Sequence, residues 1–103
     1  METGEILRNG DSARAPTRYQ RRPPKRILMV DDDVLIRQIF AQVLSFFGYQ
    51  TETAEDGAVA WEALQANGYD VLVTDNNMPK VSGVELVKKV RSAHMALPVV
   101  LMS

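Results

Sequence analysis

Short apolar runs alternate with segments of helical periodicity along the chain from Arg26 onward. The run at residues 27–30 is apolar without alternation, which is typical of a strand that is buried on both faces. Strands that alternate with helices form βαβ units, in which the strands pair in parallel and right-handed crossovers place helices on both faces of the sheet. The pattern therefore predicts a single α/β domain.

Four strands and three helices are expected in this domain. The strands are predicted at residues 27–30, 49–54, 71–74 and 99–102, with the second less buried than the first. The first helix, residues 34–47, has an apolar face with the period of a helix, formed by Ile36, Ile39, Phe40, Val43, Leu44 and Phe47. Asp33 is placed to cap this helix, Asp56-Gly57 opens the second helix, and Ser82 is placed to cap the third.

Two of the predicted strands end in acidic residues. Asp31-Asp32-Asp33 follow the strand at 27–30, and Asp75 follows the strand at 71–74. Parallel strands carry both acidic ends to the same edge of the sheet, where open α/β folds place their chemistry. Carboxylates that converge there repel one another unless protons or a cation neutralise them. Because the ligands are all oxygen atoms, the hard ions Mg²⁺ and Mn²⁺ are favoured over zinc.

Helix capping is the alternative explanation for these acids. It accounts for Asp33 and, through a turn, for Asp75, but it does not account for Asp31 and Asp32. We therefore interpret the acidic group as a metal site. A carboxylate beside Mg²⁺ can also act as a nucleophile toward phosphorus, and Asp75 is the better candidate because it is expected to stand alone on a loop.

These motifs resemble the receiver domain of two-component response regulators. That family has a strand that ends in two acids, a strand that ends in Asp-x-x-Met-Pro, a downstream glycine, and an apolar strand that ends in Thr or Ser. The corresponding segments here are Val30-Asp31-Asp32, Asp75-Asn76-Asn77-Met78-Pro79, Gly83 and Pro98 to Ser103, and Glu55-Asp56-Gly57 is similar too. The resemblance extends over residues 26–103.

The resemblance implies a flavodoxin-like doubly wound sheet, with the strand order 2-1-3-4 in this chain. It implies that Asp75 accepts a phosphoryl group from a phosphohistidine of a sensor histidine kinase or a histidine phosphotransfer protein. Asp32 and Asp75 would bind Mg²⁺ directly, Asp31 through water, and Asn77 through its backbone carbonyl. Ser103 would be the switch hydroxyl that bonds the phosphoryl oxygen. The domain would signal by self-phosphotransfer and autodephosphorylation and would not act as an enzyme on other substrates.

Two of these assignments have alternatives. Asp32 and Asp33 could be the acidic pair instead, but Asp31 directly follows the strand and leaves Asp33 to cap the helix. Ser103 could be an ordinary polar residue, although its position at the end of a strand favours the switch role. A metal-dependent phosphatase is a weaker alternative for the whole site, because no Asp-x-Asp pair is present around Asp75.

The family pattern continues past the last residue of this sequence with a helix, a strand that ends in lysine, and another helix. We therefore expect a receiver domain that is incomplete after its fourth strand and lacks the lysine that pairs with the phosphoryl group. Lys80 lies near Asp75 but on the wrong side of the site. The strand at 99–102 would then be an apolar edge, and the alternative function is a non-catalytic interaction module that forms homo-oligomers through this strand.

The first part of the chain differs in composition from the rest. Residues 1–26 contain seven basic and three acidic residues, a charge of +4, whereas the remainder carries −5. We predict that residues 1–25 are a disordered basic arm, which suggests only weakly a contact with nucleic acid. The chain has no cysteine, and no apolar run approaches the roughly 20 residues that span a bilayer, so a cytoplasmic protein without a membrane partner is expected.

Overall fold

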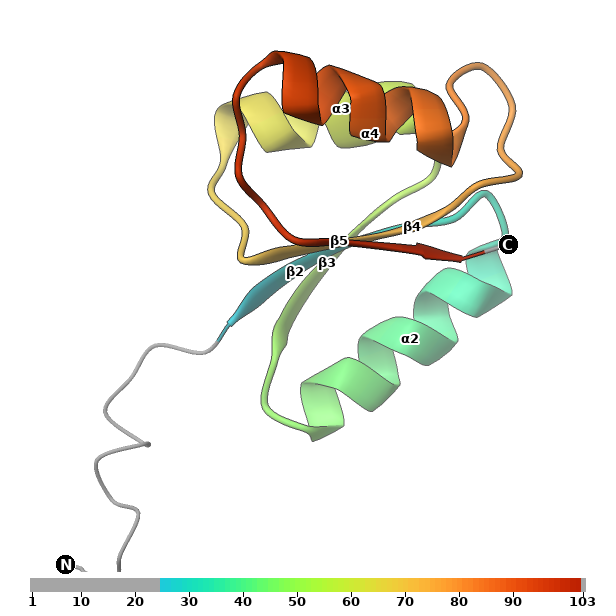
Figure 1. Cartoon of the computed structure of the whole chain (residues 1–103). Helices are drawn as coiled ribbons and strands as arrows, with labels where there is room; N and C mark the ends of the chain where they lie inside the picture. Colours follow the sequence, from blue (N-terminus) through green and yellow to red (C-terminus); the bar gives the residue numbers. More distant parts are fainter. Residues whose placement is uncertain (1–24, 103) are drawn as a thin grey trace, which may run out of the picture.

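The structure is a computed structural model that describes residues 25–102, and this part of the chain contains one parallel sheet of four strands (Figure 1). The strands are β2 (Arg26–Val30), β3 (Gln50–Ala54), β4 (Val71–Asp75) and β5 (Val99–Met102). Their order in the sheet is β3-β2-β4-β5. By position in the chain this order is 2-1-3-4, which confirms the predicted topology.

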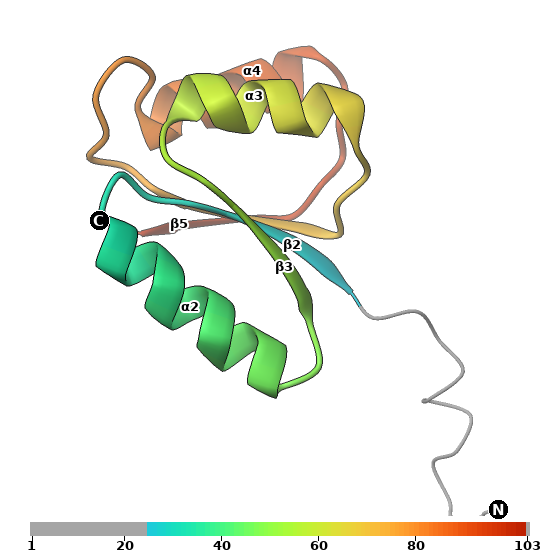
Figure 2. The same cartoon turned by 180° about the vertical axis from the view of Figure 1, so that it is seen from behind.

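Helices cover both faces of this sheet. One face carries α2 (Val34–Phe46) alone, whereas α3 (Gly57–Ala66) and α4 (Gly83–Ser92) lie side by side on the other face, as the two opposite views show (Figures 1 and 2). A parallel sheet between two helical layers is the doubly wound, flavodoxin-like architecture. The fold class predicted from the sequence is therefore confirmed.

The hydrophobic core lies between the sheet and the pair α3 and α4. Its buried side chains come from five of the elements and are Leu28, Val30, Ala54, Ala60, Leu64, Leu72, Leu86 and Val90. Burial of each Val or Leu side chain contributes roughly 1.5–3 kcal/mol to stability. The core therefore holds the central strands rigidly, and the ends of β2 and β4 with them.

The other face is covered much less completely. Helix α2 contains no buried residue, although Ile36, Phe40 and Leu44 are partly covered. The apolar face predicted for this helix also included Ile39 and Val43, yet these side chains are 54% and 48% exposed. They belong to the predicted apolar face, but a single helix meets the sheet along a stripe narrower than that face.

Side-chain caps begin the three helices as the sequence predicted. The Asp33 carboxylate accepts hydrogen bonds from the first-turn amides of α2, and Asp56 does the same for α3. Ser82 and Glu85 form a reciprocal capping box at the start of α4. Each cap contributes about 1 kcal/mol, and all three lie close to the carboxyl edge of the sheet. Within residues 25–102, no helix has both the length and the apolar character needed to cross a membrane.

Candidate functional site

Three carboxylates gather at the carboxyl edge of the sheet. Asp31 and Asp32 directly follow β2, and Asp75 is the last residue of β4. Because β2 and β4 pair in parallel, with Val30 opposite Thr74, the two strand ends lie next to each other. One carboxylate oxygen from each of the three residues lies within 4.8 Å of the other two. The structure therefore brings together the three acids that the sequence predicted as metal ligands.

The acidic cluster is electrostatically strained. Asp31 is only 6% exposed, and burial raises the pKa of its carboxyl group, with the charges of Asp75, Asp32 and Asp33 adding to this effect. The Asp33 amide, which donates to Asp31 Oδ1 over 2.9 Å, opposes the shift only in part. Among residues 25–102, no ion pair includes Asp31, Asp32 or Asp75.

A divalent cation would relieve this strain. The donor set consists only of carboxylate oxygens close to one another, which suits a hard ion such as Mg²⁺. The nearest basic side chain from α2 does not serve this purpose, because Arg37 Nη1 donates to the Asp31 backbone carbonyl over 2.7 Å. The residues present therefore fit a magnesium site.

Asp75 has one carboxylate oxygen held by the following loop. The backbone amide of Asn77 donates to Asp75 Oδ1 over 3.2 Å, whereas Oδ2 accepts no hydrogen bond from the described part of the chain. Asp75 ends a strand rather than standing in a loop, since it pairs with Met102 of β5. The sheet therefore fixes its backbone, and one oxygen remains available for chemistry.

The start of α4 packs directly against the backbone beside Asp75. A Cβ atom on Gly83 would lie 2.5 Å from the Asp75 carbonyl oxygen and 2.9 Å from Asn76 Cα. The Gly83 amide donates to the Asn76 carbonyl over 3.2 Å, and the Val84 amide donates to Asn76 Oδ1 over 3.1 Å. Only glycine fits this approach, which explains the glycine that the sequence motif includes.

The remaining predicted site residues have different outcomes. Asp33 caps α2 and stays out of the acidic cluster, which supports Asp31 and Asp32 as the acidic pair. Asn77 is exposed and contacts Asp75 through its amide, so the role of its carbonyl stays a prediction. Ser103 lies outside the described residues, and its switch role also stays a prediction.

One contact near the site was missed in the sequence. Lys80 Nζ lies 3.4 Å from Oδ2 of Asp56, the residue that caps α3. The sequence contains the Asp-Gly signal for the helix start, but nothing in it pairs this aspartate with a lysine 24 residues later. The expectation that Lys80 lies apart from the acidic cluster is consistent with this contact.

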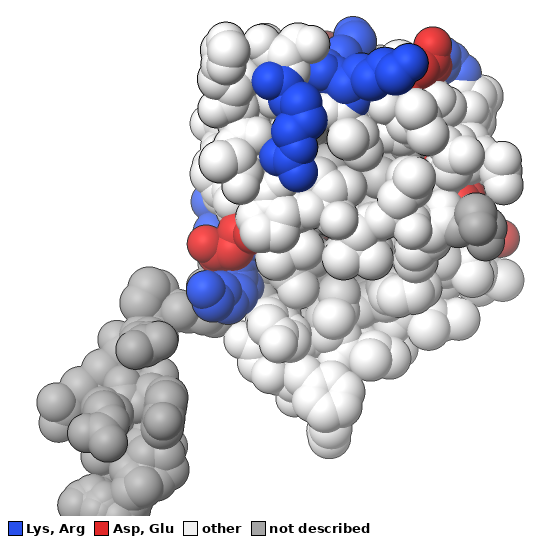
Figure 3. All heavy atoms as spheres, viewed as in Figure 1, with Lys and Arg blue, Asp and Glu red and all other residues white. Residues whose placement is uncertain are grey.

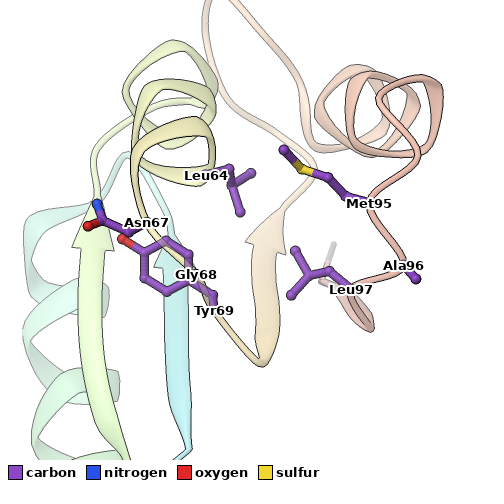
Figure 4. A pocket seen from close by; sticks show the side chains of 7 residues that line it. All are labelled: Leu64, Asn67, Gly68, Tyr69, Met95, Ala96 and Leu97. Carbon is purple, nitrogen blue, oxygen red and sulfur yellow. The ribbon is translucent and has the colours of Figure 1, made fainter.

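A concavity lies toward the amino ends of the strands, between the end of α3 and the segment that leads into β5 (Figure 4). It has a volume of about 270 Å³ and is lined by Leu64, Asn67, Gly68, Tyr69, Met95, Ala96 and Leu97. Burial, followed by the hydrogen bond to Glu52, raises the pKa of Tyr69 to about 12. The lining contains no carboxylate, so this cleft differs in chemistry from the acidic cluster.

Fold and site together define a class, the doubly wound α/β domains that carry clustered acids at the carboxyl edge of the sheet. The response regulator receiver domain family matches residues 27–103, and the chain belongs to this family. It is accordingly a phosphoacceptor module of two-component signal transduction.

Individual relatives agree with this family. The response regulator MprA of Mycobacterium sp. strain KMS is 39% identical over 80 residues, which are 78% of this chain and 35% of that protein. The chemotaxis protein CheY1 of Helicobacter pylori is 49% identical over 69 residues, which are 65% of this chain and 56% of the relative. The chain thus spans about a third of the length of MprA and just over half of CheY1.

A solved structure shows the same fold. The response regulator TrrA from Thermotoga maritima, in complex with Mg(2+)-BeF, superimposes with a TM-score of 0.72 at 35% sequence identity. The match covers 75% of this chain and 67% of the TrrA chain.

Proposed function

We propose that Asp75 is the phosphoacceptor of this receiver and that its donor is a phosphohistidine of a sensor histidine kinase or a histidine phosphotransfer protein. The observation that carries the proposal is the position of Asp75. It ends a central strand, lies within 4.8 Å of two other carboxylates, and has an oxygen that accepts no hydrogen bond from residues 25–102.

The chemistry is a nucleophilic displacement at phosphorus. The available carboxylate oxygen of Asp75 attacks the phosphorus atom, and the bond between phosphorus and the histidine nitrogen breaks. The electron pair of that bond returns to the imidazole ring, and an acyl phosphate forms on Asp75. Hydrolysis ends the signal: water attacks the same phosphorus, the bond between phosphorus and the Asp75 oxygen breaks, and inorganic phosphate and the carboxylate are released. The two reactions thus modify only the side chain of Asp75.

Asp31, Asp32 and Asp75 would hold Mg²⁺, with the backbone carbonyl of Asn77 as a further ligand. The all-oxygen cluster and the raised pKa of Asp31 support this assignment. The TrrA structure, which contains Mg(2+)-BeF, supports it from a relative. When bound, the ion would offset the negative charge of the carboxylates and of the incoming phosphoryl group.

The decisive experiment measures the acyl phosphate directly. The protein is incubated with acetyl phosphate and Mg²⁺, and intact-mass analysis is expected to show the addition of one phosphoryl group. The adduct should be absent when EDTA replaces Mg²⁺ and in the Asp75→Ala variant. A folded wild-type protein that gains no phosphoryl group under these conditions would contradict the proposal.

We also propose, as a second candidate, that the chain associates with a second copy through β5. Within residues 25–102, β5 pairs with β4 alone, and its Val100 and Leu101 are 52% and 45% exposed. The side of the molecule that β5 faces carries few charged side chains below the band over α4 (Figure 3). An apolar strand edge of this kind is a template for pairing.

Sedimentation velocity tests this association. The wild-type protein is expected to sediment as a dimer at high concentration, and Leu101→Lys should shift it to the monomer because a charge at the edge opposes pairing. A wild-type monomer at every concentration would remove this candidate without affecting the role of Asp75. The division into a basic arm at residues 1–25 and a receiver at 26–103 remains part of the proposal.

A further inference from the structure

The loop between β4 and α4, residues 76–82, is fastened to α3 as well as to α4. Lys80 Nζ lies 3.4 Å from Asp56 Oδ2 at the start of α3. Next to this ion pair, Val81 occupies the space beside Gly57, since a Cβ atom on Gly57 would lie 2.6 Å from both Val81 Cβ and the Val81 carbonyl oxygen. A side-chain contact and a backbone contact therefore hold the same part of the loop.

The ion pair uses a buried carboxylate. Asp56 is 5% exposed, and its Oδ1 accepts the Val59 amide over 2.8 Å. This hydrogen bond, followed by that from Lys80, holds the pKa of Asp56 below its usual value. Without Lys80, the Oδ2 atom of a buried carboxylate would lose its partner in the described chain. The Lys80 side chain is itself 69% exposed, so its removal leaves no cavity.

The backbone at Lys80 is strained. Its φ angle is 69°, in the left-handed region that disfavours every residue with a Cβ atom and that glycine adopts freely. A lysine at this position carries backbone strain that glycine would avoid. Glycine, however, has no side chain that could pair with Asp56. The strain and the ion pair together indicate that the ammonium group has a role in holding the loop.

We propose that Lys80 is a positioning residue for Asp75, an inference that rests on the proposed function of that residue. The Lys80 ion pair holds the loop against α3, and the same loop donates the Asn77 amide to Asp75 Oδ1. Fixing the loop therefore fixes the orientation of the Asp75 carboxylate before the phosphoryl donor arrives. Lys80 acts through the loop and makes no contact with the phosphoryl group in this role.

Four variants test the proposal. Lys80→Met removes the charge, Lys80→Gly removes the charge and relieves the backbone strain, and Lys80→Arg keeps the charge. Lys88→Met, which changes an exposed lysine of α4, is the matched control. We measure the rate of phosphorylation by acetyl phosphate at saturating Mg²⁺, the urea midpoint of unfolding, and hydrogen exchange of the Asn77 and Val81 amides.

The expected result separates positioning from folding. Lys80→Met and Lys80→Gly should phosphorylate roughly 10-fold more slowly, as misplaced reacting groups do, and both amides should exchange faster. Lys80→Arg should restore the rate to within about 2-fold, and Lys88→Met should leave it unchanged. Lys80→Gly should have a higher urea midpoint than Lys80→Met, because both variants lose the ion pair and only glycine relieves the backbone strain.

Two results would overturn the proposal: a wild-type phosphorylation rate in Lys80→Met and Lys80→Gly, or a rate loss that only matches the fraction of unfolded protein. If the wild type itself gained no phosphoryl group, the function proposed for Asp75 would fail first. Hydrogen exchange of the Asn77 backbone amide would still test whether Lys80 holds the loop in place. Unchanged exchange in Lys80→Met would exclude this role of Lys80, and faster exchange would support it.

Discussion

Glu52 and the acidic cluster at the carboxyl edge have opposite electrostatic environments. The Glu52 side chain, from the middle of β3, accepts hydrogen bonds from residues at the amino ends of the neighbouring strands, the Tyr69 hydroxyl over 2.5 Å and Arg26 Nη2 over 2.8 Å. The hydrogen bond from Tyr69, followed by that from Arg26, lowers the pKa of Glu52. At the carboxyl edge, burial and neighbouring carboxylates raise the pKa of Asp31. The protein thus compensates Glu52 with its own side chains, whereas no ion pair within residues 25–102 compensates the cluster of Asp31, Asp32 and Asp75.

This contrast teaches how to separate structural acids from functional ones in a fold of this kind. A carboxylate that the protein itself compensates adds to stability, and its removal weakens the fold. A carboxylate that lies among other carboxylates lowers the stability of the fold, because the charges repel one another. Such a group indicates a functional site, where a bound ligand compensates the charge. Each prediction below compares a residue at one end with a counterpart at the other.

The largest effect is expected for the two aspartates near the ends of β4. Asp75→Asn should abolish the phosphoryl adduct, because an amide oxygen is a far weaker nucleophile than a carboxylate. Asp70→Asn, just before the strand, should leave the adduct intact. Asp70 Oδ2 accepts a hydrogen bond from the Arg26 backbone amide over 2.7 Å, and the side-chain oxygen of an asparagine can accept the same bond. Intact-mass analysis after incubation with acetyl phosphate compares the two. Equal loss in both variants would show that folding, and not the site, had been measured.

The next effect concerns two glycines. Gly83→Ala should lower the free energy of unfolding by about 2–3 kcal/mol, because its Cβ atom would overlap the Asp75 carbonyl oxygen at 2.5 Å. Gly68→Ala, at the other end of the sheet, should change it by less than about 0.5 kcal/mol, since nothing lies within 4 Å of the new atom. Urea denaturation measures both. A tolerated Gly83→Ala would contradict the close approach of α4 to the site.

A smaller effect, of opposite sign at the two ends, is expected from removing a charge. Without Mg²⁺, Asp31→Asn should raise the free energy of unfolding by about 1 kcal/mol, because it relieves repulsion in a buried cluster. Glu52→Gln should lower it by about 0.5 kcal/mol, since the partly exposed pair with Arg26 is screened by solvent. Urea denaturation in EDTA gives both values. Shifts of the same sign would refute the distinction between the two ends.

The smallest effect is the pH dependence of the stability that Asp31→Asn adds. The raised pKa of Asp31 means that the folded state binds this proton more tightly, so stability is lost as pH rises above the usual 3.8. The lowered pKa values of Glu52 and Asp56 act in the other direction, and stability is lost as pH falls below 4.5 and 3.8, respectively. The gain from Asp31→Asn should therefore be about 0.5 kcal/mol smaller near pH 3.8 than at neutral pH. A gain that did not depend on pH would show that shape, not charge, explains it.

Most of the fold could be predicted because its signals are local. The apolar run at residues 99–102 has the bounds of β5, and Asp33, Asp56 and Ser82 cap the helices that they precede. The alternation of strands and helices predicted a parallel sheet, and the family resemblance implied the order of its strands. The three acids were predicted to meet because parallel strands bring their carboxyl ends together, and this depends on topology alone.

Features that depend on tertiary contacts could not be predicted. Helical periodicity shows that α2 has an apolar face, but it does not show that Ile39 lies outside the part of that face that the sheet covers. The pairing of Lys80 with Asp56 joins two loops that only the folded sheet brings together.

The central position of β2 and β4 also orders the steps of folding. Their junction includes the contact between Arg26 and Asp70, which are 44 residues apart in the chain, and closing so long a segment is slow and entropically costly. The acidic cluster requires this junction, so we expect it to be assembled late in folding. Mg²⁺ should consequently slow unfolding and leave the rate of folding unchanged, because the ion has no binding site until the barrier has been crossed.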